Sequence, residues 1–385
     1  MIYLDNAAST QVHQEVIEEM IPYFKEQYGN PSSIHKYGRT ASKAVHNAKK
    51  RIADLINADP SEILITSGGT ESNNTALLGT TYNSRKKHII TSTIEHEAIL
   101  EPCRRLENEG FEVTYLPVDK NGLINSEDVI KEISSDTCLI TLMYANNEVG
   151  TIQPIKEIAE VSNKKNVKFH TDAVQAIGKI PIDVKDCKVD LLSISAHKIN
   201  GPKGVGALYI RKGTTIVPFL LGGGQENGLR SGTENVASIV GFGKACQLAK
   251  QDMKKNEKHS RELRDKLVSK IFQEIPKVNL NGHPSKRIPN NANFTFLGTN
   301  GEDLIIKLDE HGIAASTGSA CSVKVQKESH VLRAMGLSHE QITGSLRLTI
   351  GSSNNEKEID ETVQVLKKIT NELRKVSPYK EKYGF

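Results

Sequence analysis

Lys198 is the residue whose surroundings most clearly indicate chemistry. It follows an apolar run, 190–194, within Ser195-Ala-His-Lys198, and stands just before Gly201-Pro-Lys-Gly204. Burial at the end of a strand lowers the pKa of a lysine and makes its amine a nucleophile, which Schiff-base chemistry requires. The alternative is a surface lysine beside a Gly-Pro turn, a description that fits Lys203 better.

Four other short segments follow apolar runs in the same way. They are Ser67-Gly-Gly-Thr70, Ile94-Glu-His96, Asn146-Asn-Glu148 and Thr171-Asp-Ala-Val-Gln175. After the first of them, a helical pattern starts at Glu71. Because ligands bind outside the carboxyl ends of the strands in an open parallel sheet, we expect these segments to meet at one site. Each alone has an ordinary alternative, since turns, helix caps and surface histidines use the same residue types.

Together these residues match the needs of pyridoxal phosphate (PLP). That cofactor requires a lysine for its Schiff base, an aspartate for its pyridinium nitrogen, a cup for its phosphate and an aromatic face against its ring. Lys198, Asp172, the glycine pair 68–69 and His96 supply these groups. A nucleoside triphosphate site is a poor alternative, because no lysine follows the glycines.

Short apolar runs and longer helix-like segments alternate along the first two thirds of the chain. The predicted strands are 62–66, 87–91, 111–115, 138–143, 167–170 and 190–194, and the helices between them are 97–110, 125–134 and 155–166. This alternation predicts a mainly parallel sheet covered by helices. The run 204–210 follows the last strand too closely for a helical crossover, so we expect an antiparallel strand there.

The last third of the chain predicts a second, smaller unit. A charged amphipathic stretch, about 233–275, is expected to connect it to the first, followed by strands at 293–296 and 345–350 and helices at 301–311 and 355–375. The predicted fold class is α/β, with a large domain at 16–250 built on a mainly parallel seven-stranded sheet. Residues 1–15 and 251–385 are expected to form a small α+β domain.

Composition narrows the class of protein. The 385 residues carry a net charge of +4, with 37% hydrophobic and 25% charged residues, which fits a globular chain and gives no reason to expect nucleic acid as a partner. No membrane span or signal peptide is visible. The five cysteines cannot all pair and form no C-x-x-C motif, so we expect a cytoplasmic protein without a metal site of its own.

Several motifs, in order over nearly the whole chain, resemble those of the cysteine desulfurases, PLP enzymes of fold type I in the class V aminotransferase group. Besides the segments above, they are Tyr3-Leu-Asp-Asn-Ala-Ala-Ser-Thr10, Gly29-Asn-Pro-Ser-Ser-Ile-His35, Arg230-Ser-Gly-Thr-Glu-Asn235 and Gly318-Ser-Ala-Cys321. The resemblance implies conversion of L-cysteine to L-alanine, with sulfur carried as a persulfide on Cys321 to an acceptor such as an iron–sulfur scaffold. It also implies a homodimer with shared active sites.

The resemblance implies a role for each site residue. Lys198 would hold the cofactor and move the Cα proton, Asp172 would pair with the pyridine nitrogen, and His96 would stack on the ring and assist reprotonation. The other implied contacts are Gln175 and Asn147 near the phenolic oxygen, Gly69, Thr70, Ser195 and His197 at the phosphate, Thr233 at the phosphate of the neighbouring subunit, and Arg347, with Asn147, at the substrate carboxylate.

Cys321 lies among small polar residues typical of an exposed loop, and not in an apolar pattern like a packing thiol. Lys324 and Lys327 nearby would favour its thiolate, which is the reactive form. Cys321 is also a possible transient ligand of an iron–sulfur cluster.

The sequence departs from the family pattern at two places. Asn227 stands where relatives usually carry arginine, and the loop after Cys321 lacks a proline often present before Ser329. The alternatives are another fold-type I enzyme, such as a selenocysteine lyase or an aminotransferase, and a non-catalytic scaffold or sulfur-relay protein that retains the fold. An aminotransferase needs no mobile thiol, so Cys321 argues against it.

Overall fold

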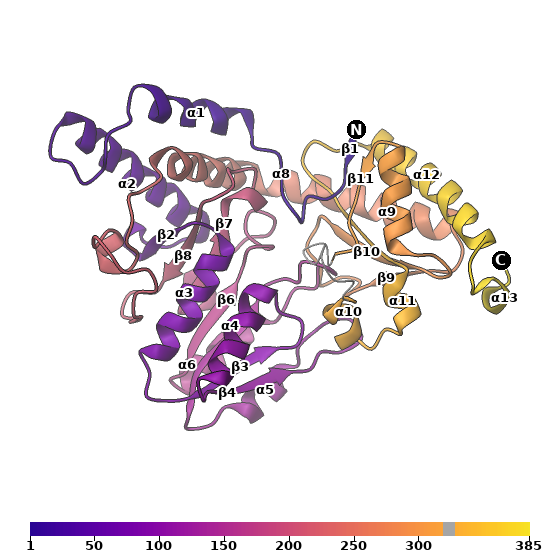
Figure 1. The fold of residues 1–385 in the computed structure, drawn as a ribbon, viewed down its shortest axis with the longest axis horizontal. Coiled ribbons are helices and arrows are strands. Elements are labelled where there is room, and N and C mark those ends of the chain that lie inside the picture. The colour runs from indigo at the N-terminus through magenta and orange to yellow at the C-terminus, as the bar shows by residue number, and fades with distance from the viewer. Residues whose placement is uncertain (319–327) are drawn as a thin grey trace.

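The computed structural model describes residues 1–318 and 328–385. It contains a large sheet and a smaller one, each covered by helices, with one long helix reaching from the first to the second (Figure 1). Every helix in these two ranges is too short or too polar to span a bilayer.

The large sheet has seven strands in the order β2-β8-β7-β6-β5-β3-β4. The strands are β2 (Ile63–Thr66), β3 (His88–Ser92), β4 (Glu112–Leu116), β5 (Thr137–Met143), β6 (Lys168–Asp172), β7 (Leu191–Ser195) and β8 (Gly206–Ile210). Strand β8 runs antiparallel to both of its neighbours, and the other neighbouring pairs are parallel. The predicted mainly parallel sheet and its antiparallel strand are therefore confirmed, and six strands end at the same edge.

Helices cover both faces of this sheet. They are α1 (Gln14–Lys25), α2 (Lys36–Ile56), α3 (Gly69–Tyr82), α4 (Glu97–Asn108), α5 (Ser126–Glu132), α6 (Ile155–Lys164) and the short α7 (Val184–Cys187), with single 3₁₀ turns η1 (Pro60–Glu62), η2 (Ala196–Lys198) and η3 (Glu226–Gly228). Helix α3 packs across β5 to β8, and its side chains are buried on most sides, which explains why it shows little amphipathic pattern.

The long helix α8 (Val236–Glu274) connects the two sheets (Figure 1). Its buried residues fall into two groups, 237–246 and 260–271. The first group lies in the part that packs on α1 and α2, and the second in the part that packs on α12 and the smaller sheet. The predicted connecting helix is therefore confirmed, and a rigid rod of 39 residues joins the two halves.

The smaller sheet is antiparallel, with β10 (Asn291–Phe296) between β9 (Val278–Asn281) and β12 (Ser345–Thr349). Its helices are α9 (Gly301–Glu310), α10 (His330–Ala334), α11 (His339–Thr343), α12 (Glu356–Lys375) and α13 (Lys380–Tyr383). The N-terminal β1 (Ile2–Tyr3) pairs with β11 (Ile313–Ala314) beside this sheet. From there the chain crosses to the large sheet, where the Thr10 amide donates to the His197 carbonyl at 3.0 Å.

Candidate active site

The segments that follow β2, β6 and β7 meet at the carboxyl edge of the large sheet, as predicted. Asn73 on α3 is hydrogen-bonded to Asp172 at the end of β6. A methyl group placed on Gly69 would lie 2.9 Å from Val174 Cγ2 and 3.8 Å from Ser195 Cβ. The glycine therefore lets the start of α3 approach the ends of two neighbouring strands.

Asp172 presents a well-supported carboxylate at this edge. Its Oδ2 accepts a hydrogen bond from Asn73 Nδ2 at 2.6 Å, and its Oδ1 accepts one from the Val174 amide at 2.9 Å. Asp172 is only 8% exposed. Two donors stabilise a buried negative charge, and such a carboxylate can pair with a protonated ring nitrogen.

Lys198 lies in η2, immediately after β7. Its Nζ donates to the carbonyl oxygens of Ala7 at 2.5 Å and Ala8 at 2.8 Å, so the N-terminal segment lies directly against the amine. The turn that follows needs Gly201, because a Cβ there would lie 2.8 Å from the Ala196 oxygen. The Gly-Pro sequence that raised the surface alternative therefore shapes the turn that holds Lys198.

His96 caps a helix and also lies beside the charged groups of the site. Its Nδ1 accepts a hydrogen bond from the Ala98 amide at 3.0 Å, at the start of α4. Burial lowers the pKa of His96, the Asp172 carboxylate opposes this effect, and the Lys198 amine lowers the pKa further. We therefore assign a neutral imidazole with its proton on Nε2.

The start of α3 has the features of an anion cup. We expected the helix to begin at Glu71, but it begins at Gly69, because Gly68 adopts a φ of 154° that glycine tolerates and caps it without a side chain. In the part of the chain that the structure describes, no side chain caps these first amides. The amides of Gly69 and Thr70 can therefore receive a phosphate at the positive end of the helix.

The other predicted phosphate ligands lie in three different environments. Ser195 ends β7 and is buried, whereas Thr233 is exposed and lines a cavity of 200 Å³ together with Ser67 and Arg230. Burial lowers the pKa of His197 to about 4, and its Nδ1 lies 3.3 Å from Ser9 Oγ.

Arg347 connects the smaller sheet to the site. Its guanidinium donates to Asp5 Oδ1 at 2.8 Å and to the Asn147 carbonyl at 2.9 Å, and the residue is 3% exposed. Its Nε is buried without a partner among the described residues. Gln175 also contacts the N-terminal segment, because its Nε2 donates to the Ala7 carbonyl oxygen at 3.0 Å.

These groups fit PLP. The uncapped start of α3 suits the phosphate, Asp172 suits the pyridine nitrogen, and Lys198 supplies the amine that the cofactor requires. We did not single out three further residues of the site from the sequence, namely Asn73, Asp5 and Lys179. Two of them had a signal, since Asp5 lies within the motif Tyr3-Leu-Asp-Asn-Ala-Ala-Ser-Thr10 and Asn73 lies one helical turn after Gly69, whereas Lys179 gave none.

Cys321 lies outside the described residues, as do Lys324 and Lys327. The described residues on either side of them both contact Glu148: Ser329 Oγ donates to its carboxylate at 2.5 Å, and a methyl group on Gly318 would lie 3.3 Å from its Oε2.

The other four cysteines are buried. Burial raises the pKa of each thiol, to about 12 for Cys103 and about 11 for Cys138. They are packing thiols.

Asn227 lies in η3 with a φ of 56°, a left-handed conformation that asparagine tolerates better than most residues. The preceding residue, Glu226, forms a 2.6 Å ion pair with Lys49 and accepts from the Ile65 amide. This turn is therefore fixed to α2 and β2 without an arginine at position 227.

Comparison with known proteins agrees with this site. Residues 2–362 match the family model Aminotransferase class-V. The chain is 51% identical to "Cysteine desulfurase IscS" of Methanosarcina thermophila, over 98% of this chain and 94% of that protein. A solved "NIFS-like protein" superposes with a TM-score of 0.90 at 41% identity, over 97% of this chain and 99% of the other. Another, "SspA in complex with cysteine", has a TM-score of 0.82 at 39% identity, over 91% and 99%. The chain therefore belongs to the class-V aminotransferase family and, within it, to the PLP-dependent cysteine desulfurases.

Proposed function

We propose that this protein converts L-cysteine to L-alanine and passes the sulfur, as a persulfide on Cys321, to an acceptor protein such as an iron–sulfur scaffold. The proposal rests on three residues that lie together at the carboxyl edge of the large sheet. They are Lys198, Asp172 with its two hydrogen-bond donors, and the neutral His96. The cysteine complex of the relative SspA supports the choice of substrate.

The residues of the chain divide the work of the reaction. When bound, PLP supplies an electron sink that acidifies the substrate Cα–H bond. Lys198 holds the cofactor, and its amine moves the Cα proton. Arg347 binds the substrate carboxylate, and since its guanidinium already contacts Asp5, the substrate competes with that carboxylate. His96, neutral at physiological pH, is placed to carry a proton on Nε2.

The sulfur step needs a thiolate. Cys321 attacks the substrate sulfur, so that an S–S bond forms and the C–S bond breaks. The electron pair of the broken bond stays with the three-carbon fragment, which takes up a proton and leaves as alanine. A thiol of the acceptor then takes the outer sulfur, which restores the Cys321 thiolate.

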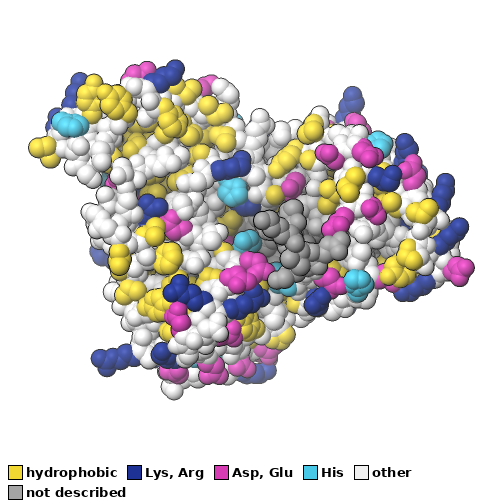
Figure 2. All heavy atoms as spheres, in the orientation of Figure 1, with side chains coloured by type: hydrophobic (Ala, Val, Ile, Leu, Met, Phe, Trp, Pro, Cys, Tyr) yellow, Lys and Arg dark blue, Asp and Glu magenta, His cyan; other side chains and the backbone are white. Residues whose placement is uncertain are grey.

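We also propose a homodimer with shared active sites, in which Thr233 reaches the phosphate of the neighbouring subunit. Apolar side chains gather at the end of the molecule formed by α1 and α2 (Figure 2). The large exposed apolar residues of this region and of the loop before η3 are Ile17, Ile21, Phe24, Tyr28, Ile34, Tyr37, Phe219, Leu220 and Leu221. Such a concentration is typical of a protein interface.

Two further proposals concern organisation and location. Separate hydrophobic cores in the two halves support a large domain at 16–250 and a small one formed by 1–15 and 251–385. A free thiol as sulfur carrier requires a reducing compartment, which supports the cytoplasm.

The test incubates PLP-loaded protein with L-cysteine and a thiol reductant and measures alanine and sulfide together. Equal amounts of both products are expected from the wild type. Cys321→Ala should lose sulfur transfer but keep the visible absorbance of bound PLP, whereas Lys198→Ala should lose that absorbance. Cys187→Ala, at a buried thiol, is the matched control and should behave as the wild type. Sulfur transfer by Cys321→Ala at the wild-type rate would overturn the proposed role of this residue.

A further inference from the structure

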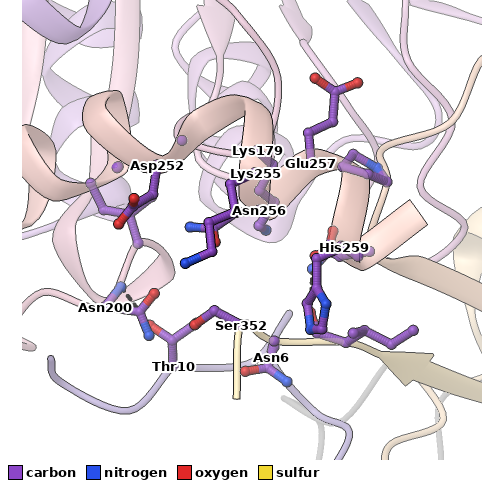
Figure 3. A pocket seen from close by; sticks show the side chains of 18 of the residues that line it. Asn6, Thr10, Lys179, Asn200, Asp252, Lys255, Asn256, Glu257, His259 and Ser352 are labelled. Carbon is purple, nitrogen blue, oxygen red and sulfur yellow. Dashed lines mark hydrogen bonds between the residues drawn. The ribbon is translucent and has the colours of Figure 1, made fainter. Parts of the chain in front are cut away.

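A cavity of 560 Å³ lies behind Lys198, between the N-terminal segment, α8 and the smaller sheet (Figure 3). Asn6 and Thr10 line it from the N-terminal segment, and Asp252 and Lys255 line it from α8. Lys179, which follows β6, also lines this cavity, between Asp252 on one side and His259 on the other in Figure 3. The reaction proposed above leaves Lys179 without a role.

Lys179 and Lys198 are connected by two polar groups. Lys179 Nζ donates to Gln175 Oε1 at 3.0 Å, and Gln175 Nε2 donates to the Ala7 carbonyl at 3.0 Å. The same carbonyl accepts Lys198 Nζ at 2.5 Å. A protonated lysine cannot accept a hydrogen bond and a carbonyl cannot donate one, so both neighbours favour the same orientation of the Gln175 amide.

The surroundings of Lys179 disfavour its positive charge. Burial lowers the pKa of Lys179 to about 7, and the positive charges of Lys198 and Arg347 act in the same direction. Below that pH the amine is a cation close to Lys198 that polarises the Gln175 amide, and above it the neutral amine can still donate to Gln175.

Other titratable groups face the cavity without bonding Lys179. His13 precedes α1, and Asp252, Lys255 and His259 lie on α8. Glu257 instead pairs with Arg261 at 2.6 Å. In the described chain, the hydrogen bond of Lys179 goes to Gln175.

We infer that Lys179 is a positioning residue that holds the Gln175 amide with its NH₂ group toward Ala7 and the cofactor. This inference rests on the proposed function, which places Gln175 near the phenolic oxygen of PLP. Through Gln175, Lys179 favours loss of the proton shared between that oxygen and the Lys198 nitrogen. A donor to the oxygen acts in this direction, and so does the charge of Lys179 while its amine is protonated.

The test is a pH titration of the visible absorbance of the PLP-loaded protein. Lys179→Met should raise the midpoint by about one pH unit, because a cation and an oriented donor are lost. Lys179→Arg, which keeps a cationic donor, should restore most of the wild-type midpoint. Lys156→Met on α6, at an exposed lysine, is the matched control and should leave the midpoint unchanged.

A double variant separates positioning from a general structural role. Gln175→Ala should raise the midpoint, and adding Lys179→Met to it should cause little further change, because Lys179 acts through Gln175. Thermal unfolding of each variant shows whether it is folded. An unshifted midpoint in Lys179→Met, or a shift that adds fully to that of Gln175→Ala, would overturn the inference alone. Failure of the wild type to bind PLP would overturn the proposed function as well.

Discussion

The hydrogen bond between Asn73 and Asp172 gives a prediction that depends on the folded chain alone. Nδ2 of Asn73 lies 2.6 Å from Asp172 Oδ2, and the two residues are 1% and 8% exposed. Asn73→Ala removes one of the two donors that support this buried carboxylate and leaves the Val174 amide as the other. The variant should be less stable, and it should bind PLP more weakly.

The expected loss can be worked out from these contacts. A hydrogen bond to a charged group contributes about 1.5–3 kcal/mol to stability. The small hole left by the side chain costs about 1 kcal/mol. Asn73 Oδ1 is buried without a partner among the described residues, so removing it stabilises the variant by about 1 kcal/mol. The two smaller effects offset each other, so we expect a loss of about 1.5–3 kcal/mol.

Urea unfolding of the PLP-free protein near neutral pH measures this loss. All variants are compared at one protein concentration, because unfolding of the proposed homodimer would depend on concentration. The control is Asn47→Ala, at an exposed position of α2, where a change within about 0.5 kcal/mol is expected.

A double-mutant cycle tests whether the charge of Asp172 is the cause. In an Asp172→Asn background, the cost of Asn73→Ala should shrink by about 1–2 kcal/mol, because the remaining hydrogen bond has a neutral acceptor. An equal cost in both backgrounds would refute the reasoning, since the effect would then come from packing.

Two further predictions concern buried groups that take no part in the proposed reaction. Burial raises the pKa of Glu95 to about 8 from an ordinary value of 4.5, so between these values the folded protein holds a proton that the unfolded chain releases. The stability of the wild type should therefore fall as the pH rises through this window. The stability of Glu95→Gln relative to the wild type should rise over the same window, by up to about 1.4 kcal/mol per pH unit. A difference between the two in urea unfolding that stays constant with pH would contradict the assignment. On α9, Leu304→Ala at a fully buried position should lower stability by about 2–5 kcal/mol. Its control, Ile306→Ala at a position that is 59% exposed, should change stability by no more than about 0.5 kcal/mol. Similar losses from both variants in thermal unfolding would contradict the idea that Leu304 stabilises the protein by packing against the smaller sheet.

The order of elements could be predicted because it depends on local patterns. Strands β2 to β8 are short apolar runs, and a run as close to its predecessor as β8 can only return antiparallel. Helix boundaries were harder where backbone geometry decides them. The predicted start of α3 was two residues too late, because Gly68 forms the cap with its backbone and no side chain marks the position.

The site could be predicted to the extent that parallel strands end at one edge. That rule brings Asp172, Lys198 and the start of α3 together without any knowledge of side-chain contacts. It gives no information on partners that come from elsewhere in the chain. Asp5 reaches Arg347 across a separation of 342 residues, and no periodicity records such a contact.

The N-terminal segment makes the site contacts that the sequence did not predict. It begins as β1 beside the smaller sheet, and then its Ala7 carbonyl accepts from both Lys198 and Gln175. A few residues earlier, Asp5 holds Arg347 of the smaller sheet. One short segment therefore bonds the residue proposed to hold the cofactor and the residue proposed to hold the substrate carboxylate. Because a backbone carbonyl accepts two of these three hydrogen bonds, its residue type carries no signal, and only the folded chain shows that one segment bonds both residues. We therefore expect a substrate that displaces Asp5 from Arg347 to loosen the segment that Lys198 holds as well.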